Sequence, residues 1–226
     1  MADTGFSAET IGFLIELRAR NDRAWYYEHK PDYERLVFKP FQALVTALAP
    51  TMQKIDPLIE TAPAIDKTIS RIYRDSRFTA DKSLYRDRAW LTFERKTKEK
   101  PDKPAFYFEL HPSGYRYGVG FYTVSPKTME AFRAAIDRDE AAFADEINRI
   151  TATGEFELAG DEYKRNRYNG AYPEIADWYN KKNIYLAANR AHVDEAFDFD
   201  TLSARLAKGF TSLAGIYLIW RKACTM

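Results

Sequence analysis

Residues 105–122, AFYFELHPSGYRYGVGFY, decide the fold class because two strand patterns flank a turn in this stretch. From Phe106 to Leu110, large apolar side chains occupy every second position, which is typical of a half-buried strand. Pro112-Ser113-Gly114 supplies turn chemistry, and the alternation resumes from Tyr115 to Phe121. The stretch therefore predicts an antiparallel β-hairpin.

The segments around this hairpin change their period in a regular way. Residues 68–73 and 89–94 also alternate with a period of two, which predicts two more strands before the hairpin. On either side, the apolar spacing is helical, with N-caps expected at Ser7, Ser125 and Asp200. Strands grouped together with helices at both ends predict an α+β fold, in which an antiparallel β-meander is packed by N-terminal and C-terminal helices.

No repeat or low-complexity linker interrupts the 226 residues. We therefore predict a single domain over residues 1–226, with a helical part at 6–60, a sheet at 65–122, and helices with loops and short strands at 125–222. Gly118 and Gly120 share one face of a strand. Such a face leaves room for a helix or a ligand to approach the backbone.

The composition excludes several classes of protein. With 34 Lys plus Arg against 33 Asp plus Glu, the net charge of +1 argues against a protein that coats nucleic acids without sequence specificity. The single cysteine, Cys224, excludes an internal disulfide and a cysteine-based zinc site, and the three histidines are far apart in the sequence. We predict no metal and no cofactor.

The sequence also gives an expectation about location. Its first residues do not resemble a secretory signal, and the longest apolar stretch, residues 210–220, is too short to span a membrane. We therefore expect a cytoplasmic protein that does not use a membrane as its partner.

The near-zero net charge conceals a segregated charge pattern. Residues 71–104 carry 11 basic and 6 acidic side chains, residues 105–163 carry 5 and 11, and residues 164–190 carry 6 and 2. The second basic segment is rich in tyrosine, which favours a loop packed on the core with solvated charges.

The first basic segment contains the densest polar cluster of the chain, in a loop between two predicted strands. Fixed guanidinium groups in such a loop can bind a phosphate or a carboxylate, with neighbouring carboxylates holding them in place. Alternatively, the same charges form a structural network of ion pairs that pins the loop to the sheet. The candidate ligand-binding residues are Arg71, Arg74, Asp75, Arg77, Asp81, Lys82 and Tyr85.

At this cluster the sequence resembles a known family. Residues 74–86, RDSRFTADKSLYR, resemble the central signature of a bacterial and fungal family catalogued as domain of unknown function 2461. That signature usually has Thr, Pro and Lys where this chain has Ser76, Leu84 and Arg86. Residues 13–26 and 156–165 are also similar to family segments. The resemblance covers nearly the whole chain and implies a one-domain α+β fold, but it implies no activity.

Three functional hypotheses follow from the residues, and the catalytic residues stay unknown. The first is binding of a small anionic ligand, phosphate or carboxylate, at the Arg/Asp-rich loop. The second is an enzyme in which Asp75 or Asp81 acts as a base and Lys82 or Tyr85 as an acid on an anionic substrate. The third is a module for nucleic-acid or protein interaction that uses both basic segments.

Overall fold

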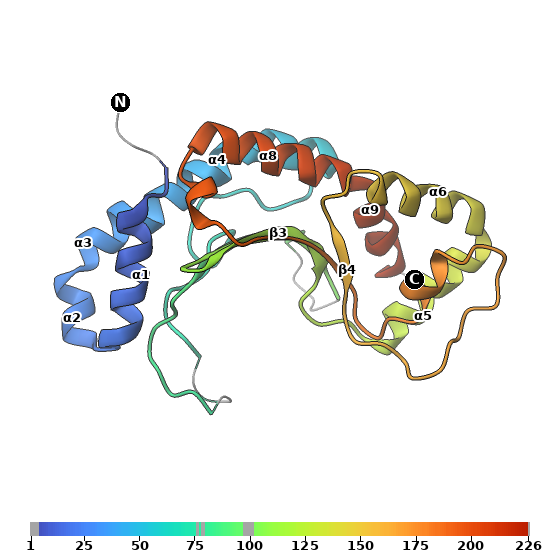
Figure 1. Cartoon of the computed structure of the whole chain (residues 1–226), viewed down its shortest axis with the longest axis horizontal. Coiled ribbons are helices and arrows are strands. Elements are labelled where there is room, and N and C mark those ends of the chain that lie inside the picture. The colour runs from blue at the N-terminus through green and yellow to red at the C-terminus, as the bar shows by residue number, and fades with distance from the viewer. Residues whose placement is uncertain (1–4, 76, 78–79, 97–101, 226) are drawn as a thin grey trace. The chain divides into compact units, whose positions relative to one another are not determined.

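The fold class predicted from the sequence is confirmed. A computed structural model describes residues 5–75, 77, 80–96 and 102–225, and in it helices precede and follow a five-stranded antiparallel sheet. The N-terminal helices include a π-helical segment, η1, and are α1 (Ala8–Arg20), α2 (Arg23–Glu28), α3 (Lys30–Tyr33), η1 (Glu34–Phe38) and α4 (Lys39–Ile55). Helices α1, α2 and α3 lie close to one another (Figure 1).

Three strands follow the N-terminal helices, and two more lie among the later helices. The strands are β1 (Ala89–Phe93), β2 (Pro104–His111), β3 (Gly114–Phe121), β4 (Glu157–Ala159) and β5 (Tyr185–Arg190). The remaining helices are α5 (Pro126–Arg138), α6 (Glu140–Thr151), α7 (Ile175–Tyr179), the 3-10 helix η2 (Val193–Ala196), α8 (Phe199–Ser212) and α9 (Ala214–Ala223).

The strand order in the sheet is β1-β2-β3-β5-β4. The meander expected from the sequence covers β1 to β3, and β5 then inserts between β3 and β4. Strands β4 and β5 are antiparallel, with Leu158 opposite Leu186. The short strands expected within residues 125–222 are therefore β4 and β5, and they pair with each other.

Two glycines of β3 let β5 come close. A Cβ atom on Gly118 would lie 1.9 Å from the carbonyl oxygen of Leu186, and one on Gly120 would lie 2.1 Å from Cβ of Tyr185. The expectation of a close approach at this glycine face was right, but the approaching element is a strand and not a helix or a ligand.

The predicted strand at residues 68–73 forms isolated bridges instead, Ile69 with Leu91 and with Ile65, and Tyr73 with Tyr85. The Ser70 N–H donates to the carbonyl of Trp90, whereas the Arg86 N–H donates to the carbonyl of Ile72. From Ser70 to Ile72 the segment advances by two residues, whereas its partner advances by four, from Trp90 back to Arg86. This change of register interrupts the ladder, as in a bulge.

Helix caps follow the sequence closely at the N-terminal ends. The side chains of Ser7, Asp22 and Ser125 accept hydrogen bonds from the backbone N–H three residues later. The C-terminal helix differs from expectation in two ways. Its cap is Asp198 instead of Asp200, since Asp198 accepts from the N–H and hydroxyl of Thr201, and Leu213 divides it into α8 and α9.

The chain divides into two compact units. The first comprises Met1–Phe93, Tyr107–Tyr117 and Asn189–Ala207, and the second comprises Glu94–Phe106, Gly118–Ala188 and Lys208–Met226. In the first unit, the ring of Phe6 packs edge-on against Phe41 with centroids 5.0 Å apart. In the second, Trp220 is fully buried among aromatic rings, including Phe121 and Phe132. The expectation of one domain over residues 1–226 stays a prediction.

Among the described residues, every helix falls short of the length and apolar character that a membrane crossing requires.

Candidate functional site

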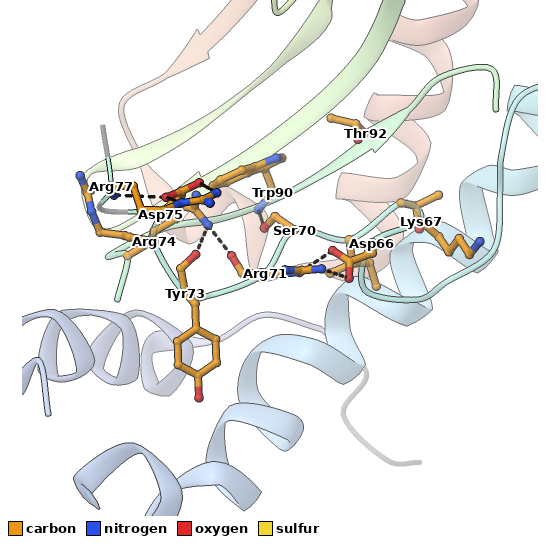
Figure 2. A pocket seen from close by; sticks show the side chains of 13 residues that line it. Asp66, Lys67, Ser70, Arg71, Tyr73, Arg74, Asp75, Arg77, Trp90 and Thr92 are labelled. Carbon is orange, nitrogen blue, oxygen red and sulfur yellow. Dashed lines mark hydrogen bonds and ion pairs between the residues drawn. The ribbon is translucent and has the colours of Figure 1, made fainter. Parts of the chain in front are cut away.

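A pocket of about 510 Å³ lies in the first unit, and the segment 66–92 supplies its whole lining. The lining combines basic, acidic, hydroxyl-bearing and aromatic side chains (Figure 2). They are Asp66, Lys67, Thr68, Ile69, Ser70, Arg71, Tyr73, Arg74, Asp75, Arg77, Arg86, Trp90 and Thr92. Five cations therefore face two carboxylates.

Local backbone structure brings these residues together. A tight turn places Asp66 at φ +63°, a left-handed conformation that Asp tolerates better than most residues. After this turn, the chain runs beside β1, where the Thr92 N–H donates to the carbonyl of Thr68. On β1, Trp90 and Thr92 alternate with buried residues, so they face away from the core. The pocket therefore forms over the outer face of β1.

Two of the arginines hold a carboxylate of the pocket in fork geometry. Arg71 donates from Nε and Nη2 to Asp66 at 2.6 and 2.5 Å, and Arg77 donates likewise to Asp75 at 2.9 and 2.7 Å. Both pairs are largely exposed to solvent. Hydrogen bonds from Arg77 lower the pKa of Asp75 to about 2, and those from Arg71 lower the pKa of Asp66.

Arg86 is fixed by the backbone and by an aromatic ring. Its Nη1 donates to the carbonyls of Arg71 and Tyr73 at 2.6 and 2.5 Å. Its guanidinium also lies 4.6 Å from the centroid of the Trp90 ring. Arg86 thereby braces the segment that carries Arg71, and its guanidinium lies over the indole ring of Trp90 in the pocket lining.

Arg74 is less exposed than Arg71 and Arg77. Its Nη2 lies 3.3 Å from Asp81, and only 26% of its side chain is exposed. Its Nε is buried without a hydrogen-bond partner in the described part of the chain. A buried donor without an acceptor is costly, so the hydrogen-bonding capacity of Arg74 is not fully used among the described residues.

Asp81 lies behind Arg74 and outside the pocket lining. It accepts from Arg18 of α1 at 2.7 Å, and it also accepts from the backbone N–H of Ser83 at 2.9 Å. Hydrogen bonds from Ser83, followed by those from Arg18, hold the pKa of Asp81 well below its usual range. Asp81 therefore anchors a pocket arginine to the first helix.

The structure brings together four of the seven residues that the sequence singled out. Arg71, Arg74, Asp75 and Arg77 line the pocket, whereas Asp81, Lys82 and Tyr85 do not. Tyr85 is fully buried, and its ring stacks on Tyr26 of α2 at 4.9 Å. Ser76, Phe78 and Thr79 of the signature lie outside the described residues.

Several lining residues were absent from the predicted set. The alternating pattern of β1 could have indicated Trp90 and Thr92, because the residues that alternate with them along the strand are apolar. Arg86 belongs to the same charged cluster and could have been added on charge alone. Asp66 and Lys67 gave no such signal, since their place in the pocket depends on the turn that precedes Arg71.

Residues 164–188 of the second basic segment lie in the second unit, and the segment contributes no residue to the pocket lining. Around the ring of Tyr163, three cations lie with their charged groups 4.7–5.4 Å from its centroid: Arg133, Arg167 and Lys182. Arg133 is buried and donates to the carbonyls of Tyr179 and Lys181. These contacts fit a tyrosine-rich loop packed on the core, but the charges are not all solvated as expected, since Lys181 is buried and paired with Glu162.

Over the described ranges, no group of three or more His, Cys, Asp and Glu residues is arranged to hold a metal ion.

The fold and the pocket define an α+β protein with a basic pocket on the outer face of its first strand. The chain belongs to the family described as conserved hypothetical protein (DUF2461), whose model matches residues 9–218. No curated protein matches the chain.

Proposed function

We propose that the pocket binds a small anionic ligand through phosphate or carboxylate oxygens. The observation that carries this function is a pocket lined by five cations and two carboxylates, in which the buried Nε of Arg74 lacks an acceptor. An oxyanion beside the Arg74 guanidinium would place negative charge where the lining has a surplus of positive charge.

The internal ion pairs of the pocket are compatible with ligand binding. The side chains of Arg71 and Arg77 are 64% and 76% exposed, and exposed pairs of this kind contribute little to stability. Each fork to an aspartate engages Nε and Nη2 of its arginine. A ligand oxygen can displace the aspartate from such an exposed pair at small cost.

Acid–base catalysis by the same residues is less well supported. A general base should have a pKa near the working pH, but the pKa values of Asp75 and Asp81 are both lowered. Burial raises the pKa of Tyr85, which also makes it a weaker acid. These shifts favour binding over proton transfer.

Isothermal titration of the whole chain with inorganic phosphate and with sulfate tests the proposal. We expect saturable binding and a loss of about tenfold in affinity in Arg74→Gln, because a charge-assisted contact to the guanidinium disappears. Arg35→Ala is the matched control: Arg35 is exposed and paired with Glu9 and Asp32 but does not line the pocket. Absence of heat with both anions, or equal losses in the two variants, would refute anion binding at this pocket.

A salt titration separates this function from nucleic-acid binding. Each phosphate contact with a nucleic acid costs about one log unit of affinity per log unit of salt. We expect no measurable binding of a short single-stranded oligonucleotide at moderate salt, because the net charge of the chain is only +1. Tight oligonucleotide binding with a steep salt slope would favour the interaction module instead.

A further inference from the structure

We infer, building on the proposed function, that the ligand carries two linked phosphoryl groups, as in a diphosphate, and does not carry a single anionic group. Charge is the first reason. The lining has five cations and two carboxylates, a surplus of three positive charges. A phosphate monoester carries roughly −1.5 to −2 at neutral pH and a carboxylate carries −1, so neither balances this surplus. Two linked phosphoryl groups do.

The distribution of the cations is the second reason. Arg71 pairs with Asp66 in one place, while Arg77 pairs with Asp75 in another. Figure 2 shows these two pairs apart from each other, with Ser70 located between them. A single phosphate at one pair leaves the other pair unused, whereas two linked groups can reach both.

The size of the pocket is the third reason. A volume of about 510 Å³ lies within the roughly 300–1,000 Å³ of pockets that hold molecules larger than one phosphate. The lining between and around the two ion pairs includes the hydroxyl groups of Ser70 and Thr92. These groups can donate to the oxygens of a bridged anion along its length.

Charge, and not the geometry of the donors, favours phosphoryl groups over two carboxylates. Arginine forks recognise either group, but a dicarboxylate carries only two negative charges and leaves the surplus of three unbalanced. A linear dicarboxylate of similar length is therefore the appropriate competitor.

Isothermal titration at constant ionic strength, without divalent cations, compares three probes: orthophosphate, pyrophosphate and succinate. We expect the wild-type chain to bind pyrophosphate at least about tenfold more tightly than orthophosphate. In Arg71→Gln, which changes only one of the two places, the advantage of pyrophosphate should fall to within about twofold. Arg35→Ala should keep the full advantage, because Arg35 lies outside the pocket.

Each outcome has a defined meaning. Equal affinity for orthophosphate and pyrophosphate in the wild-type chain would overturn the inference and leave the proposed anion site intact. Tighter binding of succinate than of pyrophosphate would overturn it as well. A pyrophosphate advantage that persists in Arg71→Gln would show that the two places do not act together. No binding of any probe would overturn the proposed function itself.

Discussion

Asp66 and Asn21 are the non-glycine residues with positive φ in the described part of the chain, at +63° and +48°. Both are residue types that tolerate the left-handed region because their short polar side chains bond locally. Asp66 lines the pocket, and Asn21 ends α1. Residues held in sparsely populated conformations often occur where a structure must present particular groups, and here both lie beside residues of the Arg/Asp cluster.

Replacing Asp66 tests the competition between the internal carboxylate and the ligand. In Asp66→Asn, the left-handed turn is retained, but Arg71 loses its anionic partner. We expect phosphate affinity to rise about two- to fivefold, which corresponds to the loss of one exposed ion pair. Calorimetric titration measures it.

A second variant controls for the backbone. Asp66→Ala also removes the charge but is poorly tolerated at positive φ, so its melting temperature should fall by about 2–4 °C relative to Asp66→Asn. Unchanged or weaker phosphate binding in Asp66→Asn would show that the carboxylate assists the ligand instead of competing with it.

Leu84 makes a hydrogen bond that the residue usual at this position in the family signature could not make. The family signature usually has proline at this position, where this chain has leucine. In the structure, the N–H of Leu84 donates to Oδ1 of Asn21 at 2.6 Å, a hydrogen bond that proline could not make. The substitution therefore adds a tie between the loop and α1.

Between elements, the main link in the first unit joins the C-terminus of α1 to residues 81–85. Asn21 Oδ1 accepts from the N–H groups of Leu84 and Tyr85, and Arg18 donates to Asp81 and to the hydroxyl of Ser83. Two segments that resemble family motifs, far apart in the sequence, thus contact each other directly. Since Asp81 also contacts Arg74, the link extends to the pocket.

Removing Asn21 should disconnect this link. Asn21→Ala leaves the two backbone donors without their acceptor and puts alanine at positive φ, so we expect a loss of about 2–4 kcal/mol in the free energy of unfolding. Urea denaturation measures it. Asn21→Asp keeps the acceptor and tolerates the conformation, so it should retain most of the stability. Comparable losses in both variants would contradict this role.

Helix α2 also contributes to a tyrosine cluster with a predictable response to alkali. Tyr26 is 5% exposed, and burial raises its pKa to about 12 from the ordinary 10.0. A raised pKa means that the contribution to stability is complete below pH 10 and is lost as the pH rises towards about 12. We expect the urea midpoint to fall over that interval, together with tyrosinate absorbance.

Tyr26→Phe removes this ionisation and should reduce the alkaline loss of stability. Titration of all 15 tyrosines near pH 10, with unchanged native circular dichroism, would contradict the buried state of this side chain.

Secondary structure was predictable from the sequence where it depends on neighbouring residues. The prediction failed where the structure depends on a segment distant in the sequence. Caps such as Ser7 and Ser125 bond within one turn, so their sequence context is sufficient. Residues 68–73 alternate as a strand should, but the register of their pairing with residues 84–92 changes within the segment. Nothing in the sequence of residues 68–73 indicates this change of register. The pocket shows the same contrast. Its basic residues stand out in the sequence, whereas the position of Asp66 in the pocket depends on the turn that contains it.

At the scale of the whole molecule, three strands belong to both compact units. Residues 104–106 of β2, 118–121 of β3 and 185–188 of β5 fall in the second unit, while the remainder of each strand falls in the first. A strand cannot lose half of its ladder without weakening the rest. The single domain expected from the sequence stays a prediction, which unfolding experiments can test.

We therefore predict one cooperative unfolding transition for the whole chain. The calorimetric and van't Hoff enthalpies should agree, and amide exchange in the two halves of β3 should report the same free energy of opening. Two resolved transitions, or much faster exchange in one half of β3, would instead indicate two domains.

The stacking of Arg86 on Trp90 also gives the protein an optical reporter. Of the four tryptophans, Trp90 alone is among the pocket-lining residues described, whereas Trp178 and Trp220 are buried in the second unit and Trp25 stacks on His29. Indole emission responds to a nearby guanidinium and to the arrival of an anion. Occupation of the pocket should thus be visible in the fluorescence of the unlabelled chain, and Trp90→Phe should abolish that signal.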